Sequence, residues 1–289
     1  MLQGKNKGIV YIIMAAFCFA FMNLFVKLAG DLPAIQKSFF RNLVAVFFAF
    51  AVLKKEHIPL EVPKGTMKYL LGRSIMGTLG VFANFYAIGK LCIADASMLN
   101  KLSPFFAIIF SYFILKEKIK PYQFICVTAA FMGTLFILRP GLDNLVTVPA
   151  FIGMIGGLGA GFAYTCVRAA SSRGVPGPFI VFFFSVFSCV SSIPFIIADH
   201  QAMSFWQLLS LLMAGLSATG GQFSITAAYS HAPAREISVY DYTQILFAAL
   251  LGMIFLGEMP DVYSIIGYII IIGAGVAMFL IRKKKEDIE

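Results

Sequence analysis

The chain has 289 residues, of which 60% are hydrophobic and 13% charged, with a mean hydropathy of +0.86 and a formal net charge of +9. A soluble chain of this size could not cover so much apolar surface, so lipid must be the solvent for most of it. The positive charge does not indicate nucleic-acid binding, because the basic residues cluster at the ends of apolar runs and not along one polar face.

Ten apolar runs are long enough to cross a bilayer, which takes ~20 mostly apolar residues. They cover about residues 8–28, 34–53, 68–90, 94–115, 121–138, 149–172, 178–198, 206–230, 234–256 and 261–281. Backbone in lipid must satisfy its own hydrogen bonds, and these runs do not alternate as barrel strands do. We therefore predict an all-α integral membrane protein with ten transmembrane helices. The first run is too long for a signal peptide, so we expect it to be retained.

The distribution of charge predicts an orientation. With the N-terminus inside, the inner segments hold most of the 23 Lys and Arg residues, whereas Lys37, Arg41 and Lys101 are counted on the outer side. Arg73 is counted on the inner side. The positive-inside rule then predicts a protein of the cytoplasmic membrane with both termini in the cytoplasm.

The chain also contains an internal duplication. Residues 104–118 read PFFAIIFSYFILKEK and residues 245–259 read ILFAALLGMIFLGEM, so an apolar helix runs into Leu-x-Glu twice, 141 residues apart (258 minus 117). The same offset, without gaps, aligns Lys27 with Arg168, Gly80 with Gly221, Lys90 with His231, Asp95 with Glu236, Ser97 with Ser238 and Tyr122 with Tyr263. Matches of charged, Gly and Tyr residues are harder to produce by chance than Leu on Ile.

We divide the chain into a first five-helix repeat, 1–140, and a second, 141–289. Because five is odd, the second repeat is inverted relative to the first. An inverted repeat around a site near the midplane is how many secondary transporters achieve alternating access.

These features resemble the EamA-like branch of the drug/metabolite transporter superfamily. Supporting matches are Phe17-Cys18-Phe19-Ala20 followed by Lys27, Phe40-Arg41-Asn42, and Ser103-Pro104. The resemblance covers essentially the whole chain and implies a ten-helix bundle whose cavity is lined by runs one to four and six to nine. It does not specify a substrate, because members carry amino acids, nucleotide-linked metabolites, organic anions and drugs. The Gly-rich first run of the second repeat departs from its counterpart, so the halves need not be equivalent.

Polar residues inside the fourth and ninth runs are the first substrate-binding candidates, since they cost roughly 2.5–3.5 kcal/mol to insert unless they face a cavity or partner. They are Asn100, Lys101 and Ser103, and Tyr240, Asp241, Tyr242 and Gln244. We expect each set ~6 Å from its helix centre, with Lys101 toward the outside and Asp241 toward the inside. They would form a cavity with both signs of charge, or Asp241 would be a proton site. The alternative is that Lys101 snorkels outward and tyrosines hydrogen-bond Asp241.

Further candidates lie in other runs. Arg41, about two turns into the second run, suits a carboxylate or phosphate ligand, but a fixed pair with Asp95 or a lipid headgroup is an alternative. The neutral candidates are Asn23, Asn84, Tyr86, Tyr164 and Gln222. Ordinary interhelical hydrogen bonding is the alternative for each of them.

Charged residues near the helix ends indicate two gates. They are Lys27, Lys90 and Asp95 near the outer face, and their images Arg168, His231 and Glu236 near the inner face. We hypothesise that one cation–carboxylate cluster, such as Lys27 with Asp95, closes each side in turn, the alternative being solvated interfacial charges. Glu117 and Glu258 are expected to cap the amides of the span that follows each.

The sequence carries no Walker A, GxSxG, HExxH or dinucleotide motif, and its three histidines lie apart, so we expect no enzyme activity, cofactor or metal. The favoured function is secondary active transport of a small anionic or zwitterionic metabolite, such as an amino acid or organic acid. Efflux of an amphipathic or cationic compound is one alternative, and an integral-membrane scaffold or enzyme is another. Expected partners are the substrate, membrane lipid and a coupling proton or ion, with the protein a monomer or homodimer.

Overall fold

A computed structural model provides the structure, which describes residues 2–116, 121–138, 144–231 and 240–286. Its helices are α1 (Leu2–Leu28), α2 (Ala34–Lys55), α3 (Met67–Lys90), α4 (Ile93–Asn100), α5 (Ser103–Ile114), α6 (Pro121–Leu138), α7 (Asn144–Ser171), α8 (Gly177–Ala198), α9 (Phe205–His231), α11 (Thr243–Leu256) and α12 (Val262–Glu286). Since α4 and α5 together make one crossing, these are ten transmembrane helices, as predicted, in two repeats.

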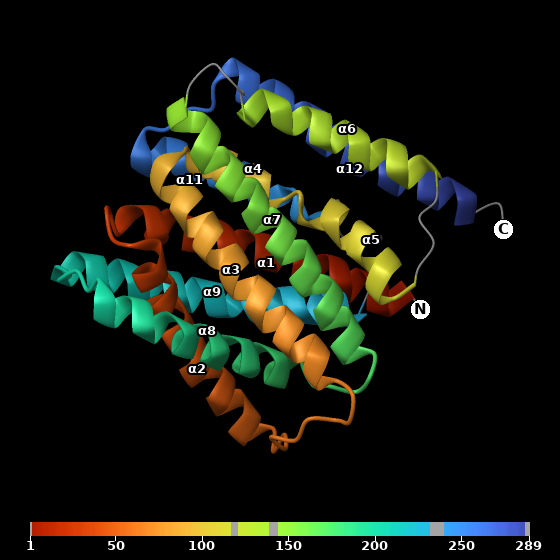
Figure 1. Cartoon of the computed structure of the whole chain (residues 1–289). Coiled ribbons are helices and arrows are strands. Elements are labelled where there is room, and N and C mark those ends of the chain that lie inside the picture. The colour runs from red at the N-terminus through yellow and green to blue at the C-terminus, as the bar shows by residue number, and fades with distance from the viewer. Residues whose placement is uncertain (1, 117–120, 139–143, 232–239, 287–289) are drawn as a thin grey trace.

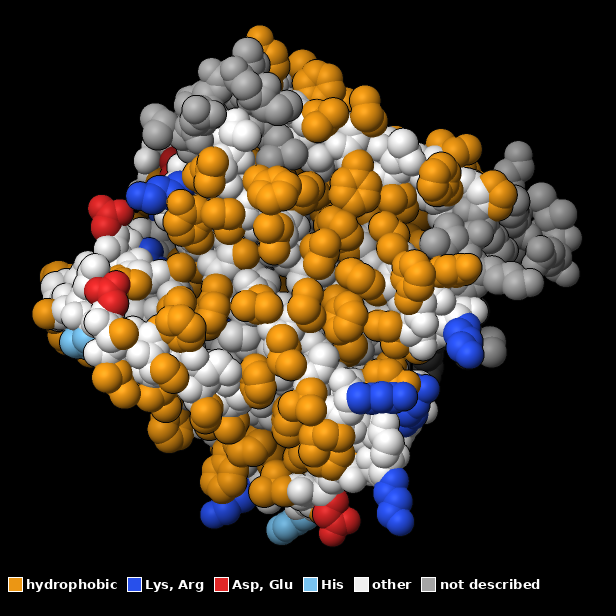
Figure 2. Space-filling view, in the orientation of Figure 1, with side chains coloured by type: hydrophobic (Ala, Val, Ile, Leu, Met, Phe, Trp, Pro, Cys, Tyr) orange, Lys and Arg blue, Asp and Glu red, His pale blue; other side chains and the backbone are white. Residues whose placement is uncertain are grey.

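Most of these helices match the dimensions of a bilayer. Among the described residues seven helical segments are long and apolar enough to span it, one of them α4 with α5, and α6 and α11 are shorter apolar helices. Hydrophobic side chains cover the middle of the face in Figure 2, and charged side chains lie toward its edges. Helix α1 begins and α12 ends on the same side of the bundle (Figure 1), as an even number of crossings requires.

The packing of the helices follows the duplication. With the 141-residue offset, α1 aligns with α7, α2 with α8, α3 with α9, α5 with α11 and α6 with α12. The two most extensive contacts, α1 with α9 and α3 with α7, exchange with each other under this relation, as do α1 with α11 and α7 with α5. The contacts of α2 with α8 and of α6 with α12 map onto themselves. The two repeats therefore pack about an approximate two-fold axis.

This symmetry places different helices in different roles. The pair α6 and α12 lies side by side along one edge of the bundle, and α2 with α8 lies toward the opposite edge (Figure 1). Helices α1, α3, α7 and α9 lie between these pairs, so they are placed to line an interior site.

Glycines let α3 and α7 touch backbone to backbone. A Cβ added at Gly159 would lie 2.6 Å from the carbonyl oxygen of Met76, and one at Gly80 would lie 3.1 Å from the carbonyl oxygen of Gly156. In the symmetry-related contact of α1 with α9, the ring of Phe19 lies against Gly221 instead. The glycines thus let α3 and α7 pack closely, whereas the Phe19 ring lies between α1 and α9 in the equivalent contact.

Several expectations from the sequence need correction. The fourth span is interrupted, because α4 ends at Asn100 and α5 begins at Ser103. Arg73, assigned to an inner segment in the charge count, is buried within α3, and the outer-side residues Lys37 and Lys101 are buried as well. Lys37 donates hydrogen bonds to carbonyls at the end of α1, so it satisfies that helix terminus. The boundary between the repeats at 140/141 lies outside the described residues.

Gly159→Ala should lower the free energy of unfolding by about 1–3 kcal/mol, because the added methyl group meets backbone that cannot rotate away. Thermal melting of the purified protein in detergent measures this. Gly273→Ala is the matched control, since nothing lies within 4 Å of a Cβ at that exposed position of α12. This variant should leave the melting temperature unchanged or raise it, because Ala is more favourable than Gly in a helix by up to about 1 kcal/mol. Equal melting temperatures for the two variants would contradict the close α3–α7 contact.

Candidate functional site

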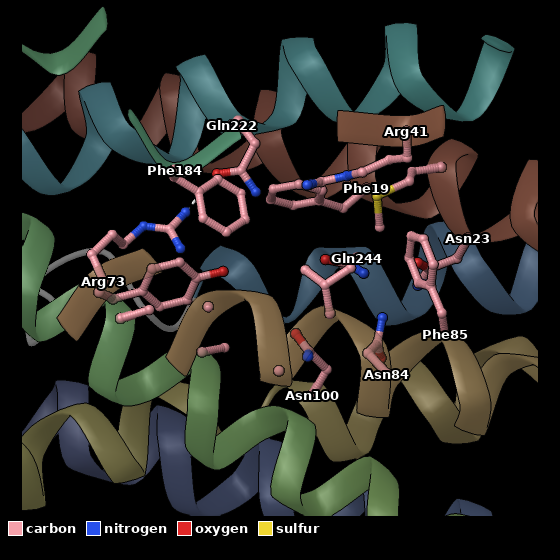
Figure 3. A pocket seen from close by; sticks show the side chains of 17 residues that line it. Phe19, Asn23, Arg41, Arg73, Asn84, Phe85, Asn100, Phe184, Gln222 and Gln244 are labelled. Carbon is pink, nitrogen blue, oxygen red and sulfur yellow. Dashed lines mark hydrogen bonds between the residues drawn. The ribbon is translucent and has the colours of Figure 1, made fainter. Parts of the chain in front are cut away.

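A cavity lined by both polar and apolar side chains lies inside the bundle where the two repeats meet (Figure 3). It is lined by Phe19, Met22, Asn23, Arg41, Arg73, Gly77, Gly80, Val81, Asn84, Phe85, Asn100, Ala160, Ala163, Tyr164, Phe184, Gln222 and Gln244. These residues come from α1–α4, α7–α9 and α11, and none comes from α6 or α12. The cavity volume is about 60 Å³, which is room for about two water molecules at their liquid volume of about 30 Å³ each.

Two arginines from the first repeat flank one aromatic ring of the second. Arg73 lies with its guanidinium carbon 4.0 Å from the centroid of Phe184, and Arg41 lies 5.9 Å from the same centroid. Arg73 also donates a 2.9 Å hydrogen bond to Gln222 Oε1, and Arg41 donates one of 2.5 Å to Asn42 Oδ1. Arg73 is only 4% exposed to solvent and Arg41 only 1%. Ring contact and amide hydrogen bonds thus hold both guanidiniums at the cavity wall.

Within the described part of the chain, neither arginine has an acidic partner. Among the described residues the ion pairs are Lys27 with Glu258 and Lys101 with Asp241, and no carboxylate lies within 4.0 Å of Arg41 or Arg73. The Nε groups of both arginines also lack a hydrogen-bond partner within that part of the chain. A buried charge is strongly disfavoured unless it is paired, so this cavity carries a positive potential that an anion would neutralise.

Amide side chains surround the rest of the cavity. Asn84, Asn100 and Gln244 gather on one side of it, across from Arg41 and Gln222 (Figure 3). Asn84 Oδ1 and Gln244 Oε1 have no hydrogen-bond partner among the described residues. These groups can accept hydrogen bonds from a polar ligand while the arginines donate to it.

The structure brings together seven of the predicted site residues at the cavity: Asn23, Arg41, Asn84, Asn100, Tyr164, Gln222 and Gln244. Tyr86 points away from it and is 39% exposed on the surface of α3. Lys101, Ser103, Asp241 and Tyr242 are buried but are not among the lining residues, and Tyr240 packs its ring against Phe279.

The fourth and ninth runs meet in a way that the sequence did not predict. Lys101 Nζ and Asp241 Oδ1 are 2.7 Å apart, and both side chains are nearly inaccessible to solvent. The prediction that they lie at opposite depths was therefore wrong, and so was the alternative in which Lys101 snorkels outward. Because the pair neutralises itself, Asp241 gives the cavity little negative charge.

Sequence reasoning missed Arg73 and Phe184 as lining residues. Arg73 could have been found by applying to it the depth argument used for Arg41, since it lies six residues into α3. Phe184 carries no such signal, because it is one of three consecutive phenylalanines in an apolar run.

An ion pair joins the two repeats at one end of the bundle. Lys27, in the last turn of α1, lies 2.9 Å from Glu258 and donates a 2.6 Å hydrogen bond to the carbonyl of Leu91. The second oxygen of Glu258 accepts a 2.8 Å hydrogen bond from the backbone amide of Ile93. Glu258 therefore caps the start of α4, and the expectation that it caps the following span was wrong.

The remaining gate residues are placed separately. Asp95 accepts a 2.7 Å hydrogen bond from Tyr268 of α12, and in this structure Lys27 pairs with Glu258 and not with Asp95. Lys90 and His231 are exposed at the ends of α3 and α9, and Arg168 lies near the end of α7. Glu236 and Glu117 lie outside the described residues.

Breaking the buried pair from one side should destabilise the fold. Lys101→Met leaves the Asp241 carboxylate buried without its cation, and we expect the free energy of unfolding to fall by about 3–5 kcal/mol. The double variant Lys101→Met with Asp241→Asn removes both charges and should recover most of this loss. Thermal or denaturant unfolding of the single and double variants measures the coupling, and strictly additive effects would contradict a direct interaction.

Comparison with known proteins identifies the family. The model of the EamA-like transporter family matches twice, at residues 6–139 and 148–281. The pseudopaline exporter CntI of Pseudomonas aeruginosa is 31% identical over 98% of this chain and 99% of its own, and a riboflavin transporter of Rhizobium johnstonii is 24% identical over 96% and 91%. A crystal structure 14% identical in sequence shares the fold, with a TM-score of 0.72 over 96% of this chain and 98% of its own. The chain is therefore a multi-pass membrane transporter, and not an enzyme, that belongs to the EamA-like transporter family.

Proposed function

We propose that this transporter is a secondary active carrier of a small metabolite bearing at least one carboxylate, and that it works by alternating access across the cytoplasmic membrane with both termini in the cytoplasm. The observation that supports this most directly is the pair of buried arginines at the wall of the central cavity, Arg41 and Arg73, which have no acidic partner among the residues that the structure describes. A guanidinium binds a carboxylate through two parallel hydrogen bonds, and the unpartnered Nε groups of both arginines are suited to this.

The charge balance disfavours a cationic substrate. Asp241, the carboxylate that would recognise a cation, is paired with Lys101 and does not line the cavity. The amide oxygens of Asn84 and Gln244 at the cavity can accept hydrogen bonds from a substrate that also carries donors. A zwitterion or hydroxylated acid therefore fits the lining better than an organic cation does.

Two relatives are named for a metabolite. One is named as an exporter of pseudopaline and another as a transporter of riboflavin. We propose that this chain likewise carries a metabolite, and we infer the carboxylate from its own cavity arginines.

The size of the cavity supports alternating access. At about 60 Å³ it is far smaller than the ~300–1,000 Å³ of ordinary ligand sites. A cavity of this size must widen to hold a metabolite, so helices of the two repeats would have to move apart, and the end held by Lys27 and Glu258 is one place where they would separate. We propose that this ion pair, together with the Leu91 and Ile93 contacts, is one gate.

Binding measurements on purified protein test the substrate class. The ligand set contains amino acids, mono- and dicarboxylic acids, riboflavin, pseudopaline and lipophilic organic cations. We expect carboxylates to raise the melting temperature, and Arg41→Gln and Arg73→Gln each to weaken their binding about 10- to 100-fold, as for a lost charge-assisted hydrogen bond of about 1.5–3 kcal/mol. Uptake into proteoliposomes should fall in parallel.

The matched control for these variants is Arg173→Gln. That arginine lies over the ring of Tyr69 at the end of α7, remote from the cavity lining, and its loss should not change ligand affinity. Preferential binding of organic cations, or carboxylate binding that survives both cavity variants, would contradict the proposal.

A native cysteine reports on the gate. Cys92 lies between Leu91 and Ile93, where it is half-buried beside the Lys27–Glu258 pair. In a background with the other four cysteines replaced, Glu258→Gln keeps an acceptor for the Ile93 amide but removes the charge. We expect Cys92 to react roughly fivefold faster with a maleimide, since a partly exposed ion pair contributes up to about 1 kcal/mol.

Asp95→Asn is the control for local charge, because it also removes a negative charge that acts on the Cys92 thiol but leaves the Lys27–Glu258 pair in place. It should raise the labelling rate less than Glu258→Gln does. If Glu258→Gln and Asp95→Asn label equally fast, the ion pair does not hold this end closed.

A further inference from the structure

The buried pair of Lys101 and Asp241 lies at matching helix breaks. Lys101 is the residue after α4, two positions before α5 begins, and Asp241 precedes Tyr242, the residue before α11. The 141-residue offset aligns Lys101 with Tyr242, so the two repeats are interrupted at the same point. Interrupted helices deep in the bilayer are where transporters commonly place sites for substrate and coupling ion.

The pair lies directly behind the cavity wall. Asn100, the neighbour of Lys101, lines the cavity, and so does Gln244, less than one turn after Asp241. The pair also joins the two repeats through the contact of α4 with α11. A movement of one repeat against the other therefore changes the cavity and the Lys101–Asp241 distance together.

The surroundings of Asp241 are suited to holding a proton. Its Oδ1 atom meets the ammonium of Lys101, whereas Oδ2 has no hydrogen-bond partner among the described residues. The hydroxyls of Tyr229 and Tyr242 likewise lack partners there. Among the described residues, the titratable groups that interact with this carboxylate are Lys101, from the α4–α5 break, Tyr164 of α7, Tyr229 of α9 and Tyr242 beside it.

We propose that Asp241 is the coupling-proton site of this transporter, and that a proton and the ammonium of Lys101 compete for its carboxylate. When the repeats separate and the ion pair is stretched, a proton adds to a carboxylate oxygen and gives a neutral acid. The net charge of the pair then rises from zero to +1, carried by Lys101 next to Asn100 at the cavity. This rests on the proposed function: the released ammonium adds to the positive potential of Arg41 and Arg73, so proton binding and anion binding reinforce each other.

One aromatic contact extends from this site to the cavity. Tyr229 stacks on Tyr164 with ring centroids 5.0 Å apart, and Tyr164 is a lining residue. A change of charge at Asp241 therefore changes the electrostatic potential at Tyr164, a cavity residue, as well as at Lys101 beside Asn100.

Infrared difference spectroscopy of the protein without any substrate tests the site. Acidifying wild-type protein labelled with carbon-13 at the Asp side-chain carboxyl should produce the carbonyl stretch of a buried protonated acid, shifted by the label. The band should be absent in Asp241→Asn and kept in Asp95→Asn, the control carboxylate bonded to Tyr268. In Lys101→Met the carboxyl has lost its competing cation, so the band should appear at a higher pH than in the wild-type protein.

Two results would overturn the proposal. One is a labelled wild-type protein that forms no such band down to the lowest pH at which it stays folded, a result that depends on no variant. The other is a band that persists in Asp241→Asn. Because no ligand is used, failure here is distinct from failure of the carboxylate-binding tests on Arg41 and Arg73.

Discussion

The organisation of this transporter depends on the high free energy of a charge surrounded by low-dielectric material. A cation in the interior of a membrane bundle must find an anion, a dipole or an aromatic face. Lys101 finds Asp241, and Lys37 finds carbonyl groups at the end of a helix. Arg41 and Arg73 find amides and the ring of Phe184, which hold them without neutralising them. Lys37 and Lys101 are therefore structural charges, whereas the two arginines lie at the cavity wall and are open to a ligand.

The number of helices and their duplication were readable from the sequence because both depend on local pattern. A run of about 20 apolar residues must span, and the Leu-x-Glu ends and the match of Lys27 with Arg168 align the halves without structural knowledge. The interruption at Lys101 was less visible, since Pro104 marks a bend but not which residues leave the helix.

The candidate site could be predicted only in part, for a physical reason. A sequence shows the depth of a polar residue in the membrane but not the rotation of its helix. The polar residues could therefore be expected to face the interior as a group, but the sequence could not show this for Asn23 or Gln222 individually. Lys101 and Asp241 meet because helices from both repeats place them on one level, and that depends on packing around the two-fold axis. Tyr86 illustrates the opposite case, because it shares α3 with Asn84 yet points outward.

The approximate symmetry of the helices is not matched by their side chains, and this has a mechanical consequence. Both cavity arginines belong to the first repeat, and the offset places Phe182 and Ala214 at their equivalents in the second. An anion held by Arg41 and Arg73 would stay attached to the first repeat throughout a transport cycle, while the second repeat moves over it with Phe184 and Gln222. The first repeat would then bind the ligand while the second repeat encloses it. The rates of inward and outward transport of one ligand therefore need not be equal.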